Sequence, residues 1–365
     1  MHREVIAIRQ ARFSHCTLRE RVPLRKQTVS MLLTSLDAPG VAPVSGPLTW
    51  PSARDMFENA FDLGLERRIK YLWRLALTWN VRGRLLREFD GQAMARALFS
   101  AQPRAFYPVM NHLIDRRLGA QARLHATLTS LRVVTASVGD EANVHSLLTQ
   151  GITLIELTDN TRVVLSLNDV SFHEGLWQIG LIGADGVRLY SIGFGFIDAQ
   201  TLLMGNVQGP SLKDDGPDRI RDVTHAAHGM RPPHLLVHTL RVLAAQWGAT
   251  RLQGVDPENH VKGRWNLRDS RLRFDYRGFW AEHEGARDKD GNWSLPLATA
   301  MRPLEEVPTK RRAMYRRRYA MLEALQLAVA TLADVRHAMP PMAAAQQELD
   351  TDAANSSTLE PALVA

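Results

Sequence analysis

The spacing of hydrophobic positions changes along this chain from a helical pattern to an alternating one. In the first part, apolar residues recur every three or four positions, which predicts helices. These helices are expected at 52–61, 65–89 and 113–131. One face of the second helix carries Leu72, Leu75, Ala76 and Trp79, with basic residues outside that face. The pattern therefore predicts a helical region on the N-terminal side of the fold.

Short apolar and alternating runs follow, separated by turn residues. Strands are expected at 152–157, 162–168, 176–182 and 188–197. Asp-Asn, Glu-Gly and Asp-Gly pairs between them predict an antiparallel meander. In the last strand, one face is largely aromatic, whereas the other carries Gly193 and Gly195. Such a bare face admits a ligand or another stretch of backbone, although a bulge or tight bend is the commoner explanation.

A strand, a connector, a helix and a second strand then follow without a gap. The strand at 202–207 ends at Gln208 and Gly209, and a short helix is expected to end near His228 and Gly229. The apolar spacing of 234–247 predicts a helix, and 252–255 reads as a buried strand. This order predicts a βαβ-like unit, and a further strand is expected at 272–276.

Together these elements predict an α+β fold: a helical N-terminal part, an antiparallel meander and a βαβ-like unit. The order resembles the acetyltransferase-like (GNAT) fold, in which a helix N-terminus after the fourth strand binds the pyrophosphate of an acyl-CoA. The chain lacks that family's Gln/Arg-x-x-Gly-x-Gly/Ala loop and has a longer connector with Gly229 and Arg231 instead. The resemblance is therefore one of fold, and it makes acyl-CoA the candidate cofactor.

Composition adds the expected domain organisation. With 365 residues and 45% hydrophobic content, the chain can bury a substantial core. We expect a disordered basic tail at 1–50, a helical region at 51–135, a mixed sheet and helix domain at 136–330 and a disordered acidic tail at 338–365. No apolar run is long enough for a secretory signal or a membrane span, which predicts a cytoplasmic protein. The lone Cys16 excludes an intramolecular disulfide.

Charge points to anionic partners. The net charge is +7, and residues 309–319 hold six basic residues and no acidic one. In the helix expected at 309–325, Tyr315, Tyr319, Leu322 and Leu325 form an apolar stripe. The remaining surface carries Arg311, Arg312, Arg316, Arg317 and Arg318. Such a helix can lie on an anionic lipid surface at the inner membrane or, less favoured here, on nucleic acid; alternatively it docks through its tyrosines with solvated arginines.

Candidate chemistry concentrates in the βαβ-like unit. A helix beginning after Pro233 would offer free N–H groups to an anion, and Arg231 would add a forked donor. The candidate ligand-binding residues are Gly193, Gly195, Gln208, Gly209, Gly229 and Arg231. The candidate general bases are His228, Asp256, Glu258 and His260. Each of these four also has a structural interpretation as a helix cap or turn residue.

A metal site is the rival chemistry, because five histidines lie between His225 and His260. The helix that carries His234 and His238 lacks the carboxylate of a His-Glu-x-x-His pattern, so no metal site is predicted. Signatures for nucleotide phosphate loops, serine hydrolases and dithiol redox sites are also missing from the sequence.

Four separated motifs carry a resemblance to a known family. They are Met-Gly-Asn-Val-Gln-Gly at 204–209, His-Gly-Met-Arg-Pro at 228–232, Asp-Tyr-Arg-Gly-Phe-Trp at 275–280 and Lys-Arg-Arg-Ala-Met-Tyr-Arg-Arg-Arg-Tyr at 310–319. In their order and spacing, across 72–325, the chain resembles the VirK/YbjX family of bacterial proteins. The resemblance implies links to virulence, envelope behaviour and resistance to cationic antimicrobial peptides. It implies no catalytic residue, because the family is defined by a domain of unknown function.

Two functional classes follow from these observations. One is an acyltransferase-like enzyme acting on an envelope component or another small acceptor. The other is a non-catalytic module whose basic surface binds anionic lipid, nucleic acid or a protein. A deep pocket between the strand at Met204 and the strand at Leu252, floored by Gly193 and Gly195 and opening at Arg231, would favour the enzyme. A filled seam there, beside an exposed basic helix at 315–319, would favour the module.

Overall fold

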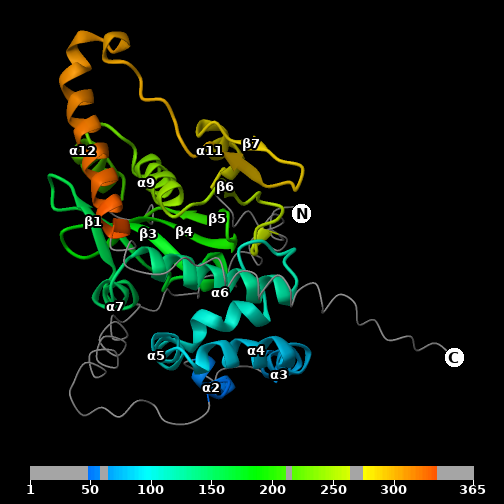
Figure 1. The fold of residues 1–365 in the computed structure, drawn as a ribbon. Coiled ribbons are helices and arrows are strands. Elements are labelled where there is room, and N and C mark those ends of the chain that lie inside the picture. The colour runs from blue at the N-terminus through cyan, green and yellow to red at the C-terminus, as the bar shows by residue number, and fades with distance from the viewer. Residues whose placement is uncertain (1–47, 58–64, 211–215, 264–273, 335–365) are drawn as a thin grey trace, which may run out of the picture. The chain divides into compact units, whose positions relative to one another are not determined.

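The computed structural model describes residues 48–57, 65–210, 216–263 and 274–334, all within the unit Gly46–Ala365. It is a mixed α+β fold in which helices precede an eight-stranded, mostly antiparallel sheet (Figure 1). At this level the predicted fold class is confirmed. The predicted tails at 1–47 and 335–365 lie outside the described residues.

Helices occupy the first part of the described chain. They are α2 (Ala53–Met56), α3 (Leu65–Leu77), α4 (Trp79–Asp90), α5 (Ala93–Ala101), the 3-10 helix η1 (Pro103–Met110), α6 (Ala120–Ser137) and α7 (Glu141–Thr149). The single helix predicted at 65–89 is broken at Thr78, whose hydroxyl donates to the Arg74 carbonyl oxygen at 2.6 Å. The predicted core face of that helix is also wrong, because Leu72 and Trp79 are exposed and Tyr71 is buried.

The helix predicted at 113–131 begins later, at Ala120, because the preceding segment pairs with distant parts of the chain. Asp115 forms an isolated antiparallel bridge with His260. The Arg116 N–H donates to the Asn259 carbonyl oxygen at 2.8 Å, and the Asn292 side chain donates to the Asp115 carboxylate at 3.0 Å. This pairing ties the helical part to the end of the sheet.

The sheet consists of one meander and one parallel pair. Its strands are β1 (Ile152–Glu156), β2 (Arg162–Leu167), β3 (Trp177–Ile182), β4 (Arg188–Asp198), β5 (Thr201–Gln208), β6 (Arg251–Gly254), β7 (Ala286–Arg287) and β8 (Trp293–Leu295). They lie in the order β1-β2-β3-β4-β5-β6-β8-β7. Among the strand pairs of the described residues, only β5 and β6 run parallel. The predicted meander and βαβ-like unit are thus confirmed.

Further helices cross over between β5 and β6 and follow β6. They are α8 (Gly216–Ala226), α9 (Pro232–Gln246), α11 (Tyr276–Glu282), the 3-10 helix η3 (Leu304–Glu306) and α12 (Thr309–Asp334). The strand predicted at 272–276 is wrong at Tyr276, which begins α11. The Asp275 side chain caps this helix by accepting from the Gly278 N–H at 3.0 Å. Residues 272 and 273 lie outside the described residues.

Helices cover both faces of the sheet (Figure 1). On one face, α9 packs against β3, β4 and β6, and its last turn brings Trp247 to within 6.3 Å of the Phe194 and Phe196 rings. On the same side, α12 contacts α9 and the edge strand β1, and on the other face α6 packs against β4. The predicted aromatic face of β4 is therefore part of the core.

The glycine face of β4 and β5 is filled by other backbone and side chains. A Cβ added at Gly193 would lie 2.9 Å from the Glu174 carbonyl oxygen, and one added at Gly205 would lie 2.1 Å from the same atom. A Cβ at Gly195 would lie 3.2 Å from the Ser130 hydroxyl. The glycines thus admit the 3-10 helix η2 (Phe172–Glu174) close to the sheet, beside a register shift between Gly193 and Phe194.

Candidate functional site

The parallel pair separates at its carboxyl end. Residues of β5 and β6 pair from Thr201 with Arg251 to Met204 with Gly254, after which β5 continues to Gln208 while β6 stops. Ligands of open sheets bind beyond the carboxyl ends of parallel strands. This end of the sheet is therefore the expected place for a ligand.

A pocket of about 330 Å³ lies there, between β4, the start of α9 and α11. Its apolar lining includes Tyr190, Ile220, Phe274 and Phe279. Its polar lining consists of Arg231, His234, Asp275 and Glu282. Small-ligand sites of this kind combine aromatic walls with a few polar groups and begin near this size.

Arg231 and His234 share one carboxylate in the pocket. The Arg231 guanidinium lies 2.7 Å from Glu282 Oε2, and His234 Nε2 lies 3.2 Å from the same oxygen without forming a hydrogen bond. The His234 ring also packs 4.4 Å from the His283 ring.

The two imidazoles of this site have lowered pKa values. Burial is the largest cause for His234, and the positive charge of Arg231 adds to it, whereas the Glu282 carboxylate raises the pKa of this ring. Burial likewise lowers the pKa of His283 to about 3. Both imidazoles are therefore neutral at neutral pH.

The first turn of α9 offers fewer N–H groups than the sequence predicted. Pro232 and Pro233 have none, and the N–H groups of His234 and Leu235 both donate to the Arg231 carbonyl oxygen at 3.0 and 3.1 Å. The expected free N–H groups at this helix start are therefore not found. The guanidinium of Arg231 is the cation left to bind an anion in the pocket.

The other predicted ligand-binding residues are divided among three places. Gly209 lies beside the pocket, where a Cβ would be 2.8 Å from the Tyr190 ring, and Gln208 is exposed at the end of β5. Gly193 and Gly195 are covered by other protein atoms, including Glu174 and Ser130, so no ligand reaches them. Gly229 has φ +77° and contacts Met314 and Arg318 of α12. The structure thus brings Gly209 and Arg231 to the pocket but not Gly229.

A buried polar cluster lies beside the pocket. The Glu174 carboxylate accepts from Asn206 at 3.1 Å, pairs with Lys262 at 2.8 Å and lies 3.3 Å from His260 Nε2. Burial raises the pKa of Glu174, but His260 and Lys262 outweigh it and lower the pKa to about 2. The carboxylate is therefore ionised, and the ammonium group of Lys262 balances its charge.

Pocket and cluster meet at Tyr276. Its ring lies 5.0 Å from that of Phe274 in the pocket and 5.8 Å from that of His260. Its hydroxyl accepts from the Val207 N–H at 3.4 Å, and burial raises its pKa. This tyrosine therefore fills the gap where β5 and β6 separate.

The predicted bases near His260 are already engaged. His260 Nδ1 accepts from the Lys262 N–H at 3.1 Å, which places the ring proton on Nε2, toward Glu174. No lone pair of this imidazole is then left for a substrate. Asp256 is fully buried, and its carboxylate accepts from Arg277, from the Trp293 indole and from the Glu258 N–H.

Glu258 and His228 complete the set of predicted bases. Glu258 is about half exposed and binds Arg277 at 2.7 Å. His228 lies in the turn after α8 at φ +52°, and its carbonyl oxygen accepts from Arg318 of α12. None of the four predicted bases lines the pocket. His234 and Glu282 do, although the sequence marked His234 only as a metal candidate.

The basic helix α12 is partly docked and partly exposed. Leu322 and Leu325 are buried, and Arg318 stacks on Tyr315 at 4.4 Å. Arg312 donates to the Val307 and Glu305 carbonyl oxygens at 3.0 and 3.2 Å. Arg311, Arg316 and Arg317 are exposed. The helix therefore agrees with the docked interpretation, with a docked C-terminal half and three solvated arginines, and its binding to lipid or nucleic acid stays a prediction.

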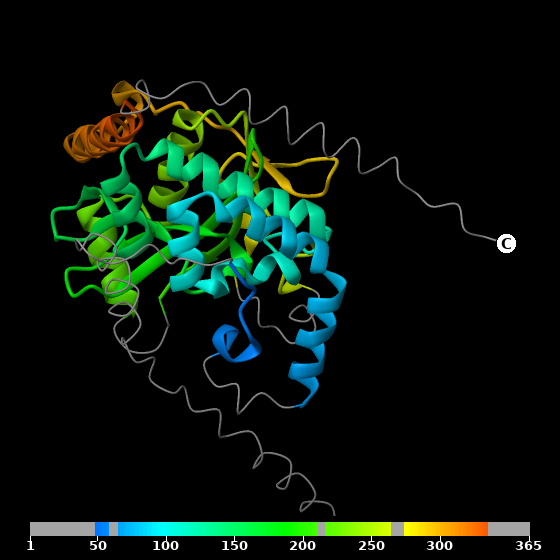
Figure 2. The same cartoon turned by 60° about the horizontal axis from the view of Figure 1, so that its bottom comes forward.

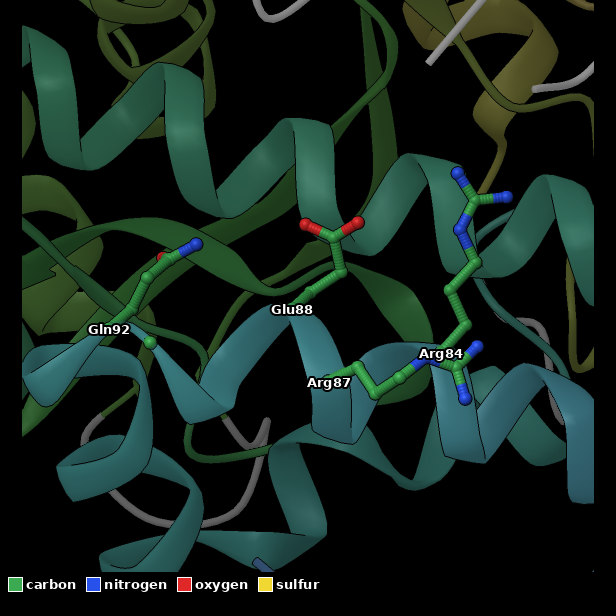
Figure 3. A pocket seen from close by; sticks show the side chains of 5 residues that line it. Arg84, Arg87, Glu88 and Gln92 are labelled. Atoms are coloured by element: carbon green, nitrogen blue, oxygen red, sulfur yellow. The ribbon is translucent and has the colours of Figure 1, made fainter. Parts of the chain in front are cut away.

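A second, more polar hollow of about 670 Å³ lies beside α4. It is lined by Arg84, Arg87, Glu88, Gly91 and Gln92 (Figure 3). Glu88 points toward α6, where Arg132 binds it at 2.7 Å (Figure 3). Because the hollow lacks an apolar wall, it fits a small-molecule site less well than the pocket at Arg231.

Membrane-spanning helices and metal-binding clusters are both absent from the described ranges. No helix there combines the length and apolar composition needed to cross a bilayer. Nor do three His, Cys, Asp or Glu side chains gather there as a metal ion would require.

A family model and several bacterial proteins match this chain. A family model described as "Protein of unknown function (DUF535)" matches residues 64–331. An uncharacterized protein of Haemophilus influenzae is 33% identical over 61% of this chain and 76% of its own length. The uncharacterized protein YbjX of Escherichia coli is 30% identical over 44% of this chain and 49% of its own length. The membrane protein LapB of Mannheimia haemolytica is 26% identical over 56% of this chain and 90% of its own length. No solved structure gives a significant match.

Proposed function

Because the chain belongs to the DUF535 or VirK/YbjX family, whose function is not established, we propose a function from the site: an acyltransferase-like enzyme that binds an acyl-CoA. The observation that carries this proposal is the pocket at the carboxyl end of the parallel pair. It lies beyond the carboxyl ends of parallel strands, where ligands of open sheets bind, and an acetyltransferase-like order of elements would bind its ligand at this end. Its aromatic wall and Arg231 suit a ligand that is partly apolar and partly anionic.

Two side chains have roles in this proposal. Arg231 binds an anionic group of the acyl-CoA, exchanging Glu282 for the ligand. His234 accepts a proton from the acceptor amine or hydroxyl as that group attacks the thioester carbonyl carbon. The carbon–sulfur bond then breaks, and the leaving thiolate takes up the proton from His234. The lowered pKa of His234 supports the role of a base, because it keeps the ring unprotonated.

The acceptor in this proposal is a component of the bacterial envelope. Two points support it: the resemblance to the family implies a link to envelope behaviour, virulence and cationic-peptide resistance, and the relative LapB is named a membrane protein. A non-catalytic module that binds polyanions is the second candidate. It is favoured by the exposed Arg311, Arg316 and Arg317 and by the filled seam above Gly193 and Gly195.

Replacing Arg231 by alanine should weaken acetyl-CoA binding about 10- to 100-fold, because the variant loses a charge-assisted contact. Titration calorimetry and thermal shift with acetyl-CoA measure the change. Arg251→Ala is the matched control, since Arg251 is similarly exposed and pairs with Asp198 at 3.0 Å. Equal affinity in Arg231→Ala, or only salt-sensitive binding to any polyanion, would favour the second candidate.

The dependence of acyl transfer on pH should follow His234. Its pKa is lowered from the ordinary value by burial, so the active neutral form persists below pH of about 6.5. We expect the acid limb of kcat/KM to lie below that pH and to disappear in His234→Gln together with most of the rate. An unchanged profile in this variant would remove His234 from the reaction.

A further inference from the structure

Exposed apolar side chains are concentrated on one helix. Among the described residues, nine large hydrophobic side chains are strongly exposed, and six of them lie on α3 or at the start of α4. They are Leu65, Ile69, Leu72, Trp73, Leu77 and Trp79. A patch of this kind on a surface marks an interaction site.

The patch lies on the side of α3 that faces away from the protein. Tyr71 is 2% exposed, its hydroxyl donates to the Pro51 carbonyl oxygen at 2.8 Å, and its ring packs against Phe57 and Tyr107. Leu75 packs against the same cluster. At 100° per residue, Leu65, Ile69 and Leu72 lie more than 90° from Tyr71 around the helix. Figure 2 shows α3, in blue, at the edge of the helical part and away from the sheet.

Basic residues accompany this apolar stripe. The helix carries Arg67, Arg68, Lys70 and Arg74 against Glu66 alone, and Lys70 pairs with Glu66. This surface is therefore apolar and positively charged at once, a combination that favours the interface of an anionic bilayer over a neutral apolar partner.

We propose that α3 and the start of α4 bind the surface of an anionic lipid bilayer, with the apolar stripe inserted among the acyl chains. The helix has 13 residues and is about 20 Å long, so it lies in the interface and does not cross it. Trp73 and Trp79 supply amphipathic rings of the type that accumulates at headgroup level. The inference does not depend on the proposed acyl transfer.

Flotation of the full-length protein with vesicles tests the proposal. Vesicles of phosphatidylglycerol and phosphatidylcholine should bind it, and vesicles of phosphatidylcholine alone should bind it more weakly. The test variant is Ile69→Gln/Leu72→Gln/Trp73→Gln. The control variant is Val187→Gln/Met301→Gln/Leu327→Gln, which removes the other three exposed large hydrophobic side chains. The test variant should lose about tenfold or more in vesicle partition, and the control should match the wild type.

Two measurements decide between occupants of this surface. Circular dichroism and thermal unfolding should be the same in both variants, since the replaced side chains are exposed. Sedimentation velocity shows whether the stripe joins two copies of the chain. Wild-type protein that does not float, equal flotation of the test variant, or a dimer that only the test variant dissociates would each overturn the proposal.

Discussion

Asp256→Ala should lower the free energy of unfolding by about 3–5 kcal/mol, the range for removing one partner of a buried ion pair. The carboxylate is fully buried and accepts from Arg277 twice at 3.2 Å, from the Trp293 indole at 3.0 Å and from the Glu258 N–H at 3.0 Å. Alanine would leave the Trp293 indole and the Glu258 N–H without this acceptor. Arg277 would keep only its ion pair with the Glu258 carboxylate. Urea denaturation at neutral pH measures the loss.

The control for this variant is Asp218→Ala, an exposed carboxylate that pairs with Arg221 at 2.9 Å. It should cost less than about 1 kcal/mol, because exposed ion pairs contribute little.

The advantage of the wild type over Asp256→Ala should also depend on pH. Burial raises the pKa of Asp256, but Arg277 and the other donors lower it further, to below its ordinary value. The contribution is therefore present above pH of about 4 and is lost as pH falls through the lowered pKa. Equal losses in the two variants at neutral pH would contradict a central structural role for Asp256.

Gly205→Ala should destabilise the fold by about 3 kcal/mol, near the upper end of the usual cost of overpacking. The added methyl group would lie 2.1 Å from the carbonyl oxygen of Glu174 and 2.8 Å from its carbonyl carbon. These are backbone atoms, so they cannot move aside by a change of rotamer. The 3-10 helix η2 would have to shift, and the contacts of Glu174 with His260 and Lys262 would lengthen with it. Chemical denaturation gives the change in stability.

Gly91→Ala is the matched control for the change at Gly205. No atom lies within 4 Å of a Cβ at Gly91, and its φ of −86° suits any residue. The variant should stay within about 0.5 kcal/mol of the wild type or gain slightly, because alanine restricts the unfolded chain. If Gly205→Ala behaves like Gly91→Ala, the close approach of η2 to β5 is not as tight as the structure shows.

Local patterns were enough to predict β1 to β6 but not the short strands β7 and β8. Turn pairs such as Asp185-Gly186 fix hairpins through a few neighbouring residues, and the parallel strand after α9 follows from alternating strand and helix patterns. The orientation of α3 did not follow from its pattern. Apolar residues occupy both the Tyr71 side and the Leu72 side of this helix, and spacing alone does not say which side meets the protein.

The site depends on contacts between residues that are far apart in the sequence. Glu174 reads as an ordinary turn residue before Gly175, and its meeting with His260 and Lys262 requires the whole sheet. The pocket requires α11, whose start was predicted as a strand, to bring Glu282 to Arg231. Periodicity carries no information on such distant pairings, although the Gly-Met-Arg-Pro-Pro connector did point to one wall of the pocket.

The bridge between Asp115 and His260 has a consequence for how the protein is made. The Asp115 segment donates its Arg116 N–H to the Asn259 carbonyl oxygen and accepts from the Asn292 side chain, and Asn292 is synthesised 177 residues after Asp115. Chains leave the ribosome from the N-terminus, and domains fold as units once their parts are present. The helical part therefore emerges with the Asp115 carboxylate and Ile114 still lacking their final neighbours, and its last contacts form only when the β7–β8 hairpin has left the exit tunnel.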